Sequence, residues 1–503
     1  MTLTVLAATV LALLLPQRLR RPDWLSQLAI WLGLLALVMV VPFTFIAVNF
    51  GYADFETVTI MASDVPVSDM VGVAVLDFAR PLMETIATTG LLLIATWFLM
   101  RWLPGFVPIL ALIAVFSIMT SHPASYAYGR IFPDPAMKMI GLADLEPPEI
   151  QAVPKKKPNL VLIYLESLER SYRDIPASSD AFADFGQMED KGFSARNVGQ
   201  IHGTHFSAAG HVATLCGVPM LPRGLSDPKK VKTAEDATRH GVADFLPGVT
   251  CLGDILSEQD YDTTYINGAD AELFAIAELM RSHGFASVRG LKTEPEHANS
   301  PSNNTWGVPD SELFKVGTEE LDRLSAGSRP FALVLFTSST HGPYGYLDPG
   351  CDYVPPIKPA QADSLMPATI HCSGALVKGF LEELDRLNLT DDTVVALMSD
   401  HLVMANTMIK ELKKVGDARR NYVVILNDAG GIDGTVSDRA ATMMDVYPTI
   451  LEAMGFTLKN GAGNLGRSLL SGGDTLAETL GLDTVNRALF GNQEIRRSVW
   501  TPR

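Results

Sequence analysis

The chain has 503 residues, of which 47% are hydrophobic, and a formal net charge of −16 at pH 7. This length implies two or three structural units rather than a single domain. The acidic charge excludes a nucleic-acid partner, because binding to phosphate backbones needs clustered Lys and Arg.

Four apolar stretches open the chain, at about Thr2–Pro16, Leu25–Ala53, Leu82–Met100 and Trp102–Ser121. A transmembrane helix needs about 20 apolar residues, and the second stretch is easily long enough. The first is short and the third has Glu84 near its start, so the alternative is that one of them is a buried or interfacial helix. We predict that residues 1–121 form a transmembrane anchor of about four helices.

Basic residues predict how this anchor is oriented. The two short connections between apolar stretches contain four arginines, Arg18, Arg20, Arg21 and Arg101. Connections rich in Arg stay in the cytoplasm, so everything after the fourth stretch should lie outside. The four cysteines all occur in that part, at positions 216, 251, 351 and 372. We expect two disulfides there, in any of the possible connectivities, and no structural zinc site because no CxxC spacing occurs.

Residues 122–158 are rich in Pro and in short polar runs, which is typical of a linker. Residues 159–503 then alternate short apolar runs with stretches of helical pattern, such as Ala375–Arg386 and Ala440–Met454. The apolar runs are Asn159–Leu165, Phe331–Phe336, Thr393–Met398 and Tyr422–Leu426. This alternation predicts a doubly wound α/β domain with a mainly parallel sheet.

In such a domain ligands bind beyond the carboxyl ends of the strands. Glu166 follows the first run, His341 follows the second within a few residues, and Asp400 and His401 follow the third. Each residue alone has an ordinary explanation, as a helix cap or a hydrogen-bonded histidine. Together, two carboxylates and an imidazole at one sheet edge predict a site for Mn²⁺ or Zn²⁺, with Mg²⁺ a less natural fit.

The segment Gly199–Pro219 is rich in small residues and places two hydroxyls, Thr204 and Ser207, just before a helical pattern at Ala208–Leu215. A hydroxyl at a helix start can simply cap it. The same place offers N–H groups to a phosphate, and a hydroxyl on a metal becomes a nucleophile. Three histidines crowd the segment, and we interpret them as surface polar residues rather than proton carriers: His202, His205 and His211.

These motifs resemble those of the phosphoglycerol transferases in the alkaline phosphatase/sulfatase superfamily. The resemblance is closer to the periplasmic glucan phosphoglycerol transferases of Gram-negative bacteria than to the lipoteichoic acid synthases, and it covers about Pro158 to Leu470. It implies an alkaline-phosphatase-like α/β fold behind a transmembrane anchor. It also implies a multi-pass protein of the bacterial inner membrane, with its catalytic domain in the periplasm.

The resemblance assigns roles to individual residues. Glu166 in YLES matches the first metal ligand, and Asp400 and His401 in SDH match the paired ligands. Ser207 matches the nucleophile, which also contacts the metal, with Thr204 as the alternative. Ser in place of the usual Thr keeps the hydroxyl. His341 in STHGPYG matches the histidine that contacts the substrate phosphate.

Substrate recognition follows the family less closely. Asp270 is expected to bind the glycerol hydroxyls, and His283 in SHGF is expected to be a further substrate-binding residue. Where relatives carry a basic or amide residue after Asp270, this chain reads Phe274-Ala275-Ile276-Ala277. The resemblance also implies disulfides between Cys216 and Cys251 and between Cys351 and Cys372.

The implied reaction transfers phosphoglycerol from phosphatidylglycerol in the bilayer to a glucan acceptor, through a phosphoglyceryl-serine intermediate at one divalent metal, Mn²⁺ for preference. The alternatives are a phosphoethanolamine transferase, a phosphatase or hydrolase of the same superfamily, or a non-catalytic membrane sensor on this fold. A sulfatase activity ranks lower, because Cys216-Gly217-Val218-Pro219 lacks the C-x-P-x-R order of the sulfatase nucleophile.

Overall fold

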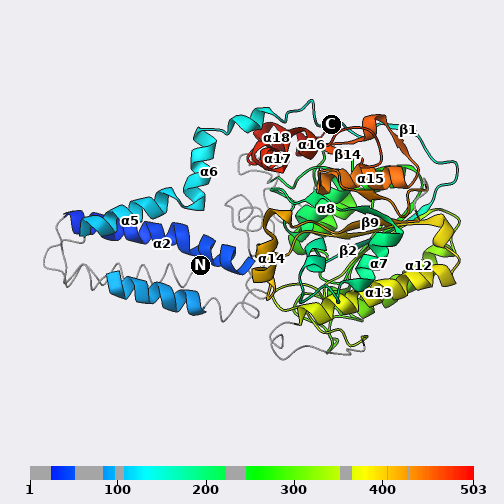
Figure 1. Cartoon of the computed structure of the whole chain (residues 1–503), viewed down its shortest axis with the longest axis horizontal. Coiled ribbons are helices and arrows are strands. Elements are labelled where there is room, and N and C mark those ends of the chain that lie inside the picture. The colour runs from blue at the N-terminus through cyan, green and yellow to red at the C-terminus, as the bar shows by residue number, and fades with distance from the viewer. Residues whose placement is uncertain are drawn as a thin grey trace. The chain divides into compact units, whose positions relative to one another are not determined.

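The computed structural model describes residues 24–50, 83–96, 107–221, 245–351, 365–404, 406–427 and 431–502. The chain divides into two compact units, Met1–Pro133 and Asp134–Arg503, whose elements are labelled in Figure 1. The first apolar stretch, Thr2–Pro16, and the four arginines used to predict orientation lie outside the described residues.

The described part of the first unit is helical and coincides with the other three apolar stretches. Its helices are α2 (Trp24–Phe50), Met83–Thr96, α5 (Val107–Met119) and α6 (His122–Ile131). Among the described residues no single helix is long and apolar enough to cross a membrane. One bent pair, Val107–Met119 with Pro123–Gly129, reaches the required length and composition together.

The second unit is built on an eight-stranded sheet with the strand order β10-β3-β9-β8-β2-β7-β5-β6. From edge to edge the strands are β10 (Val436–Ser437), β3 (Phe193–Ala195), β9 (Val423–Leu426), β8 (Thr393–Ser399), β2 (Asn159–Leu165), β7 (Phe331–Phe336), β5 (Asp262–Asn267) and β6 (Ser287–Gly290). Tyr164 of β2 lies opposite both Phe336 of β7 and Met398 of β8 in parallel register. The carboxyl ends of these three strands therefore meet at one edge.

The sheet is mainly parallel, as predicted, and it is mixed because of one strand. β9 runs antiparallel to both of its neighbours, β8 and β3. An apolar run that is buried on both faces reads the same in either direction, so the sequence of β9 carried no sign of its reversal. The strands that flank β2 are parallel to it, as predicted.

Helices cover both faces of this sheet (Figure 1). One face carries α7 (Ala183–Lys191), α12 (Asp310–Ser325), α13 (Met366–Arg386) and α14 (Ile409–Val415), and the other carries α8 (Ser207–Cys216), α10 (Leu252–Glu258), α11 (Ile276–Ser282) and α15 (Val446–Ala453). Alternate residues of β2 point to opposite faces. Ile163 packs into the core beneath α12 and α13, whereas the Tyr164 ring stacks on His211 of α8.

Smaller elements complete the second unit. The C-terminal helices are α16 (Leu476–Leu480), α17 (Leu482–Leu489) and α18 (Gln493–Val499). Three two-stranded sheets pair β1 (Ile150–Ala152) with β12 (Thr457–Leu458), β4 (Val198–Gly199) with β11 (Ala441–Thr442), and β13 (Ala462–Gly463) with β14 (Gly466–Arg467). The 3-10 turns are η2 (Pro135–Lys138), η3 (Arg170–Asp174), η4 (Leu273–Ala275), η5 (Leu291–Thr293), η7 (Thr390–Asp392), η8 (Gly416–Ala418), η9 (Met443–Asp445) and η10 (Lys459–Gly461).

The stretch predicted as a linker, residues 122–158, has structure of its own. It contains α6, η2 and β1, and from Asp134 onward it belongs to the second unit. Ile140 and Leu145 are buried there, and the Asn492 side chain donates a hydrogen bond to the Ile140 carbonyl. The second part of this stretch is therefore attached to the catalytic unit by packing.

Both disulfides implied by the family resemblance are present, Cys216–Cys251 and Cys351–Cys372. The first joins the end of α8 to the start of α10, and the second joins a loop to α13. The described residues include no free cysteine.

Candidate active site

Three side chains from two strand ends converge in the second unit. Glu166 directly follows β2, and Asp400 and His401 directly follow β8. One ligand atom from each lies within 4.8 Å of the others, and all three side chains are buried. The parallel register of β2 and β8 produces this juxtaposition, because it ends both strands at the same level.

The polypeptide around the cluster holds the carboxylates in place. Asp400 Oδ1 accepts hydrogen bonds from the backbone N–H of Ser167 at 2.8 Å and of His401 at 2.9 Å. The Ser167 hydroxyl donates to Glu166 Oε1 at 2.7 Å, and Thr337 at the end of β7 accepts from the Glu166 N–H at 3.0 Å. The buried Asp400 Oδ2 has no hydrogen-bond partner among the described residues.

The electrostatics of the cluster require a positive charge at its centre. His401 Nδ1 donates to the Leu402 carbonyl at 2.8 Å, so Nε2 faces Asp400 Oδ2 at 3.2 Å and Glu166 Oε1 at 3.8 Å. Burial, and then the charge of Asp400, raise the pKa of Glu166 well above its ordinary value. A proton on the Glu166 carboxylate, or a metal ion between these atoms, supplies this positive charge. One imidazole nitrogen, two carboxylates and a nearby hydroxyl fit a divalent ion such as Mn²⁺ or Zn²⁺.

The hydroxyl is that of Ser207, the first residue of α8. Its Oγ donates to Glu166 Oε2 at 3.3 Å. The residue that precedes the helix is Phe206, and no side chain caps the helix start, so simple capping does not explain Ser207. The alternative nucleophile, Thr204, is fully buried and uses its hydroxyl in a local turn with Ile201. The structure therefore brings Ser207 to the cluster and leaves Thr204 in the turn.

Gly210 allows α8 to approach the cluster so closely. A methyl group at this position would lie 1.9 Å from the carbonyl oxygen of Asp400, far inside van der Waals contact. Only glycine lets the first turn of α8 pack on the backbone that follows β8. Close packing thus explains why the Gly199–Pro219 segment is rich in small residues. The composition alone did not give this reason.

The three histidines of this segment are buried, so their interpretation as surface polar residues is wrong. His202 and His205 are at most 3% exposed, and His211 is 0% exposed. His211 bridges the Ser207 carbonyl at 2.7 Å and the Tyr265 hydroxyl at 3.2 Å, and burial lowers the pKa of its ring to about 4. A neutral, doubly hydrogen-bonded His211 supports the first turn of α8 from behind.

His341 lies on the loop that follows β7. Its neighbour Thr340 donates a hydrogen bond to the Glu166 carbonyl, which ties this loop to the cluster. His341 Nδ1 donates to the Gly342 carbonyl at 2.7 Å, and burial lowers the pKa of the ring to about 4. The ring is therefore neutral at physiological pH, and Nε2 is the nitrogen that carries the lone pair.

Two residues that the sequence analysis did not single out position this loop. The Trp306 ring stacks on His341 with centroids 3.8 Å apart. Asp310 Oδ1, at the start of α12, accepts from the N–H groups of Ser338 at 2.8 Å and Ser339 at 3.0 Å. The sequence feature that could have indicated these two residues is the stretch Trp306-Gly-Val-Pro-Asp310. In this stretch an aromatic residue lies just before a Pro–Asp pair that starts a helix.

Asp270 lies on the loop after β5, partly exposed, and its Oδ1 accepts from the Glu272 N–H at 2.9 Å. In the atypical stretch that follows, Phe274 and Ala275 both have positive φ, 56° and 59°. Such angles are strained for residues with a side chain and cluster at functional sites. The centroid of the Phe274 ring lies 6.2 Å from that of Phe206, the neighbour of Ser207, so this loop places an aromatic side chain beside the start of α8.

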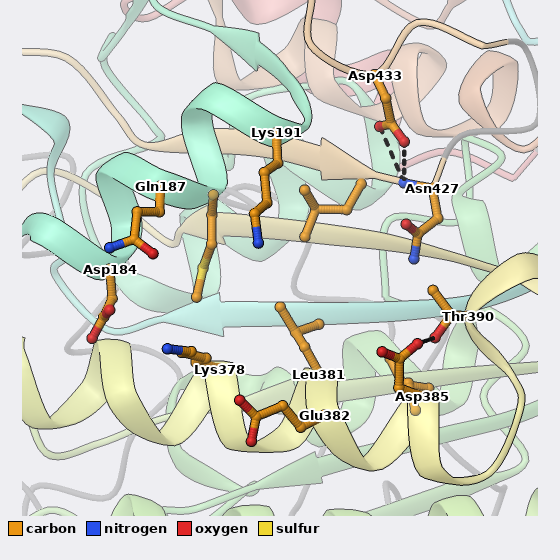
Figure 2. A pocket seen from close by; sticks show the side chains of 13 residues that line it. Asp184, Gln187, Lys191, Lys378, Leu381, Glu382, Asp385, Thr390, Asn427 and Asp433 are labelled. Carbon is orange, nitrogen blue, oxygen red and sulfur yellow. Dashed lines mark hydrogen bonds between the residues drawn. The ribbon is translucent and has the colours of Figure 1, made fainter.

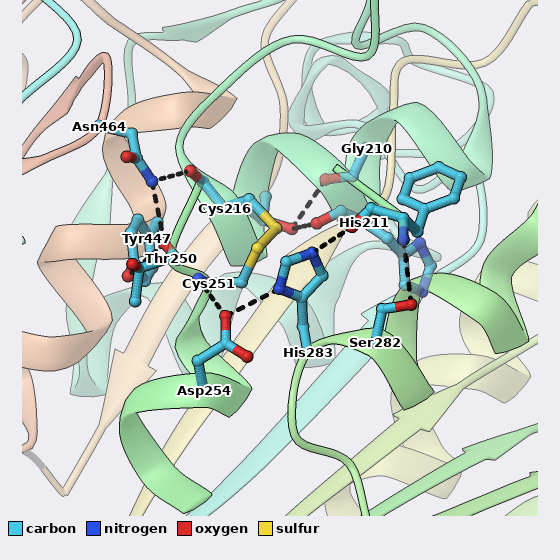
Figure 3. The surroundings of a disulfide bond; sticks show 12 residues. Gly210, His211, Cys216, Thr250, Cys251, Asp254, Ser282, His283, Tyr447 and Asn464 are labelled. Carbon is cyan, nitrogen blue, oxygen red and sulfur yellow. Dashed lines mark hydrogen bonds and ion pairs between the residues drawn. A yellow bond between two sulfur atoms is a disulfide. The ribbon is translucent and has the colours of Figure 1, made fainter. Parts of the chain in front are cut away.

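His283 lies elsewhere, beside the Cys216–Cys251 disulfide at the far end of α8 from Ser207 (Figure 3). Its Nδ1 is 2.7 Å from Asp254 Oδ2, and its Nε2 is 2.8 Å from the Phe245 carbonyl. Both ring nitrogens thus face acceptors within the protein, and the ring is 5% exposed. The structure does not bring His283 to the Glu166 cluster, which departs from its predicted role in substrate binding.

We expect His283→Ala to reduce stability while leaving catalysis nearly intact. The substitution removes one hydrogen bond from Asp254, which keeps the Cys251 N–H, and removes the His283 partner of the Phe245 carbonyl, at a cost of about 1–3 kcal/mol. Thermal unfolding and steady-state kinetics of the full chain check this expectation. A large rise in KM without loss of stability would restore the substrate-binding role.

A cavity of about 250 Å³ lies between α7, α13 and the end of β9 (Figure 2). Thr390, which precedes β8, and Leu426, which ends the antiparallel β9, line it. The cavity is therefore at the sheet edge opposite to Glu166 and Asp400. Its charged lining mixes both signs, with Lys191, Lys378, Asp184, Glu382, Asp385 and Asp433, and includes none of the predicted site residues.

The family model for sulfatases matches residues 158–456, more than half of the chain. The chain belongs to the sulfatase family. The matched range contains Glu166, Ser207, His341, Asp400 and His401. It ends near α15, so α16 to α18 lie beyond it.

Two curated relatives of this sulfatase-family chain are both named phosphoglycerol transferase I. Phosphoglycerol transferase I of Salmonella typhi is 30% identical over 403 residues, which cover 74% of this chain and 50% of the relative. Phosphoglycerol transferase I of Escherichia coli (strain 55989 / EAEC) is 31% identical over 326 residues, covering 64% and 40%. The chain thus spans about half the length of the curated relatives it matches.

The crystal structure of the lipoteichoic acid synthase LtaP from Listeria monocytogenes superposes with a TM-score of 0.53 at 14% identity. The match covers 71% of this chain and 97% of that structure. At this identity the match shows a shared fold. The second unit accordingly has the alkaline-phosphatase-like α/β fold, with a mixed sheet.

Proposed function

We propose that this chain transfers phosphoglycerol from phosphatidylglycerol to a glucan in the bacterial periplasm. Residues 1–121 would form the membrane anchor, 122–158 the linker and 159–503 the periplasmic catalytic domain. One observation carries the proposal: the Ser207 hydroxyl donates to Glu166 Oε2 at 3.3 Å, beside buried Asp400 and His401. The similarity to proteins named phosphoglycerol transferase I supports the identity of the transferred group.

Glu166, Asp400, His401 and Ser207 would hold one divalent ion, Mn²⁺ for preference, with Zn²⁺ or Mg²⁺ as alternatives. Such an ion lowers the pKa of a bound hydroxyl and offsets negative charge on a transferring phosphoryl group. These residues suit a divalent ion because two carboxylates lie side by side and because Asp400 Oδ2 accepts no hydrogen bond from the described residues. Asp270 would contact the glycerol hydroxyls.

In the first half-reaction the Ser207 oxygen forms a bond to phosphorus and the bond to the diacylglycerol oxygen breaks. The serine proton ends on diacylglycerol, and phosphoglyceryl-serine remains. In the second half-reaction an acceptor hydroxyl takes the phosphoglycerol, and its proton returns to Ser207. His341 Nε2 contacts the phosphoryl group and can carry the proton in each half-reaction, because its Nδ1–H is already bonded to Gly342.

The N-terminal anchor has a physical purpose in this proposal. A phospholipid donor is confined to the bilayer surface. An enzyme tethered to the same surface meets that donor at a high effective concentration, which removes much of the entropic cost of the encounter.

We expect mass spectrometry to find a phosphoglycerol adduct on Ser207 after the full chain, in detergent, is incubated with phosphatidylglycerol and Mn²⁺. The adduct should be absent from Ser207→Ala, because that variant has no nucleophilic oxygen at the cluster. Thr204→Val is the matched control: it removes the other candidate hydroxyl, keeps the side-chain shape, and should still form the adduct.

The remaining outcomes separate the alternatives. An adduct on Thr204 would overturn the assignment of the nucleophile. An adduct from phosphatidylethanolamine alone would keep the mechanism and change the donor. Bound metal without any adduct, together with released glycerol phosphate, would indicate a hydrolase. Bound metal with neither product would indicate a non-catalytic sensor.

A further inference from the structure

The strongest unassigned feature beside the predicted site is the aromatic stack on His341. The Trp306 and His341 rings are nearly parallel, with an interplanar angle of 22° and centroids 3.8 Å apart. Trp306 is held by a tight turn, in which its own N–H and that of Gly307 both donate to Asn304 Oδ1, at 2.8 Å and 2.7 Å. The turn therefore fixes the backbone from which the indole projects onto the imidazole.

The same segment also holds the backbone that carries His341. Asp310, only 1% exposed, accepts from the N–H groups of Ser338 and Ser339. The Ser338 hydroxyl in turn donates to the Val308 carbonyl at 2.8 Å. Residues 306–310 thus contact the His341 loop at three points: its backbone through Asp310, the Ser338 hydroxyl through Val308, and the His341 ring through Trp306.

The indole N–H indicates which property of Trp306 matters. Trp306 Nε1 is buried and has no hydrogen-bond partner among the described residues. A buried N–H without a partner costs about 1–3 kcal/mol, and such a group in a folded protein calls for an explanation. Because the N–H makes no contribution here, the ring face that lies on His341 is the feature that accounts for a tryptophan at this position.

We propose that Trp306 is a positioning residue that keeps His341 Nε2 directed at the transferring phosphoryl group. Among the described residues the His341 ring has one hydrogen bond, from Nδ1 to the Gly342 carbonyl, and this bond alone still allows the ring to tilt. Stacking restricts the tilt, and catalytic groups must stay within roughly 10–20° of their productive orientation. This inference rests on the role of His341 in the proposed function.

A double-mutant cycle tests whether Trp306 acts through His341. Trp306→Leu removes the stacking face and is expected to lower kcat about 10–100-fold, with KM changed less than about 2-fold. Trp306→Phe keeps an aromatic face and is expected to retain kcat within about 3-fold. In the His341→Ala background, Trp306→Leu should have no further effect, because the ring that it positions is gone.

Each variant is assayed as the full chain in detergent on two substrates, phosphatidylglycerol and the water-soluble bis(4-nitrophenyl) phosphate. If the wild type turns over only the soluble diester, phosphatidylglycerol is not the donor. The double-mutant cycle can then still be measured with the soluble diester. Equal losses of kcat from Trp306→Leu in both backgrounds, or a rise in KM with kcat unchanged, would overturn the positioning role.

A second measurement needs no turnover. The rate at which diethylpyrocarbonate modifies His341, followed by peptide mass spectrometry, should rise at least about 5-fold in Trp306→Leu and stay near the wild-type rate in Trp306→Phe. His283, whose two nitrogens face Asp254 and Phe245, is the internal control and should not change. An unchanged His341 rate in a folded Trp306→Leu variant would show that the indole does not confine the ring.

Discussion

Replacing Glu166 with Gln is expected to reduce phosphoglycerol transfer at least about 10³-fold and, at the same time, to make the metal-free protein more stable than the wild type. The loss of activity follows from the loss of one of the two carboxylates among the four proposed ligands. The gain in stability follows because Glu166 and Asp400 are buried like charges that repel each other.

The direction of the expected change in stability follows from the way the stability of the metal-free protein depends on pH. The pKa of Glu166 is raised in the folded protein by burial and by Asp400. The folded state therefore holds a proton more tightly than the unfolded state, and stability is lost as the pH rises through the raised pKa. Metal-free wild type should therefore lose stability as the pH rises from 5 to 9, and Glu166→Gln should not show that loss.

Thermal unfolding of both proteins across this pH range, with and without Mn²⁺, checks the prediction. Mn²⁺ should raise the melting temperature of the wild type, because a ligand that binds only the folded state stabilises it, and should raise that of Glu166→Gln much less. Glu319→Gln, an exposed position on α12, is the matched control and should change neither property. A metal-free Glu166→Gln variant that is less stable than the wild type at pH 9 would contradict the electrostatic account.

Arg419→Met is expected to destabilise the second unit by about 3–5 kcal/mol. Glu169, four residues after β2, is completely buried, and the Arg419 guanidinium binds its carboxylate through two nitrogens. Arg419 also donates to the Val403 carbonyl at 2.7 Å. Without this arginine a buried carboxylate lacks its compensating charge, close to the strand end that carries Asp400 and His401.

Thermal unfolding measured by circular dichroism should show a fall of roughly 4–6 °C for this variant, since the unfolding entropy scales with the size of the unit. Arg386→Met is the control: Arg386 forms an exposed ion pair with Glu383 one turn away, and solvent screens such a pair so that it contributes little to stability. Replacing both Glu169 and Arg419 by apolar residues should cost less than Arg419→Met alone. Equal effects of Arg419→Met and Arg386→Met would show that the buried pair contributes nothing.

Much of the fold could be predicted because central strands are continuous apolar runs. The bounds predicted for β2 and β7, Asn159–Leu165 and Phe331–Phe336, are those observed. Strands buried on both faces stand out in any sequence, and polar groups that follow them directly are conspicuous. The short strands β3 and β10 at one side of the sheet were not predicted, because two or three residues carry no pattern.

The residues of the candidate site also include some that the sequence predicts and some that it cannot distinguish. Glu166, Asp400 and His401 could be named from the sequence because each directly follows a strand, and parallel strands end together. Thr204 and Ser207 could not be separated by pattern, since they are equivalent hydroxyls three residues apart. Backbone geometry separates them: Thr204 closes a turn on Ile201, whereas Ser207 opens α8 toward Glu166.

The sequence by itself determined the alternation of strands and helices, the polar groups at the strand ends and, through the family resemblance, both disulfides. Only the tertiary structure decided that β9 is antiparallel, that His283 lies by a disulfide rather than at the Glu166 cluster, and that Trp306 covers His341. The reason is that local pattern reports which residues are buried and which end a strand. Contacts between residues far apart in the chain, such as Trp306 with His341 or Glu169 with Arg419, depend on how the elements pack.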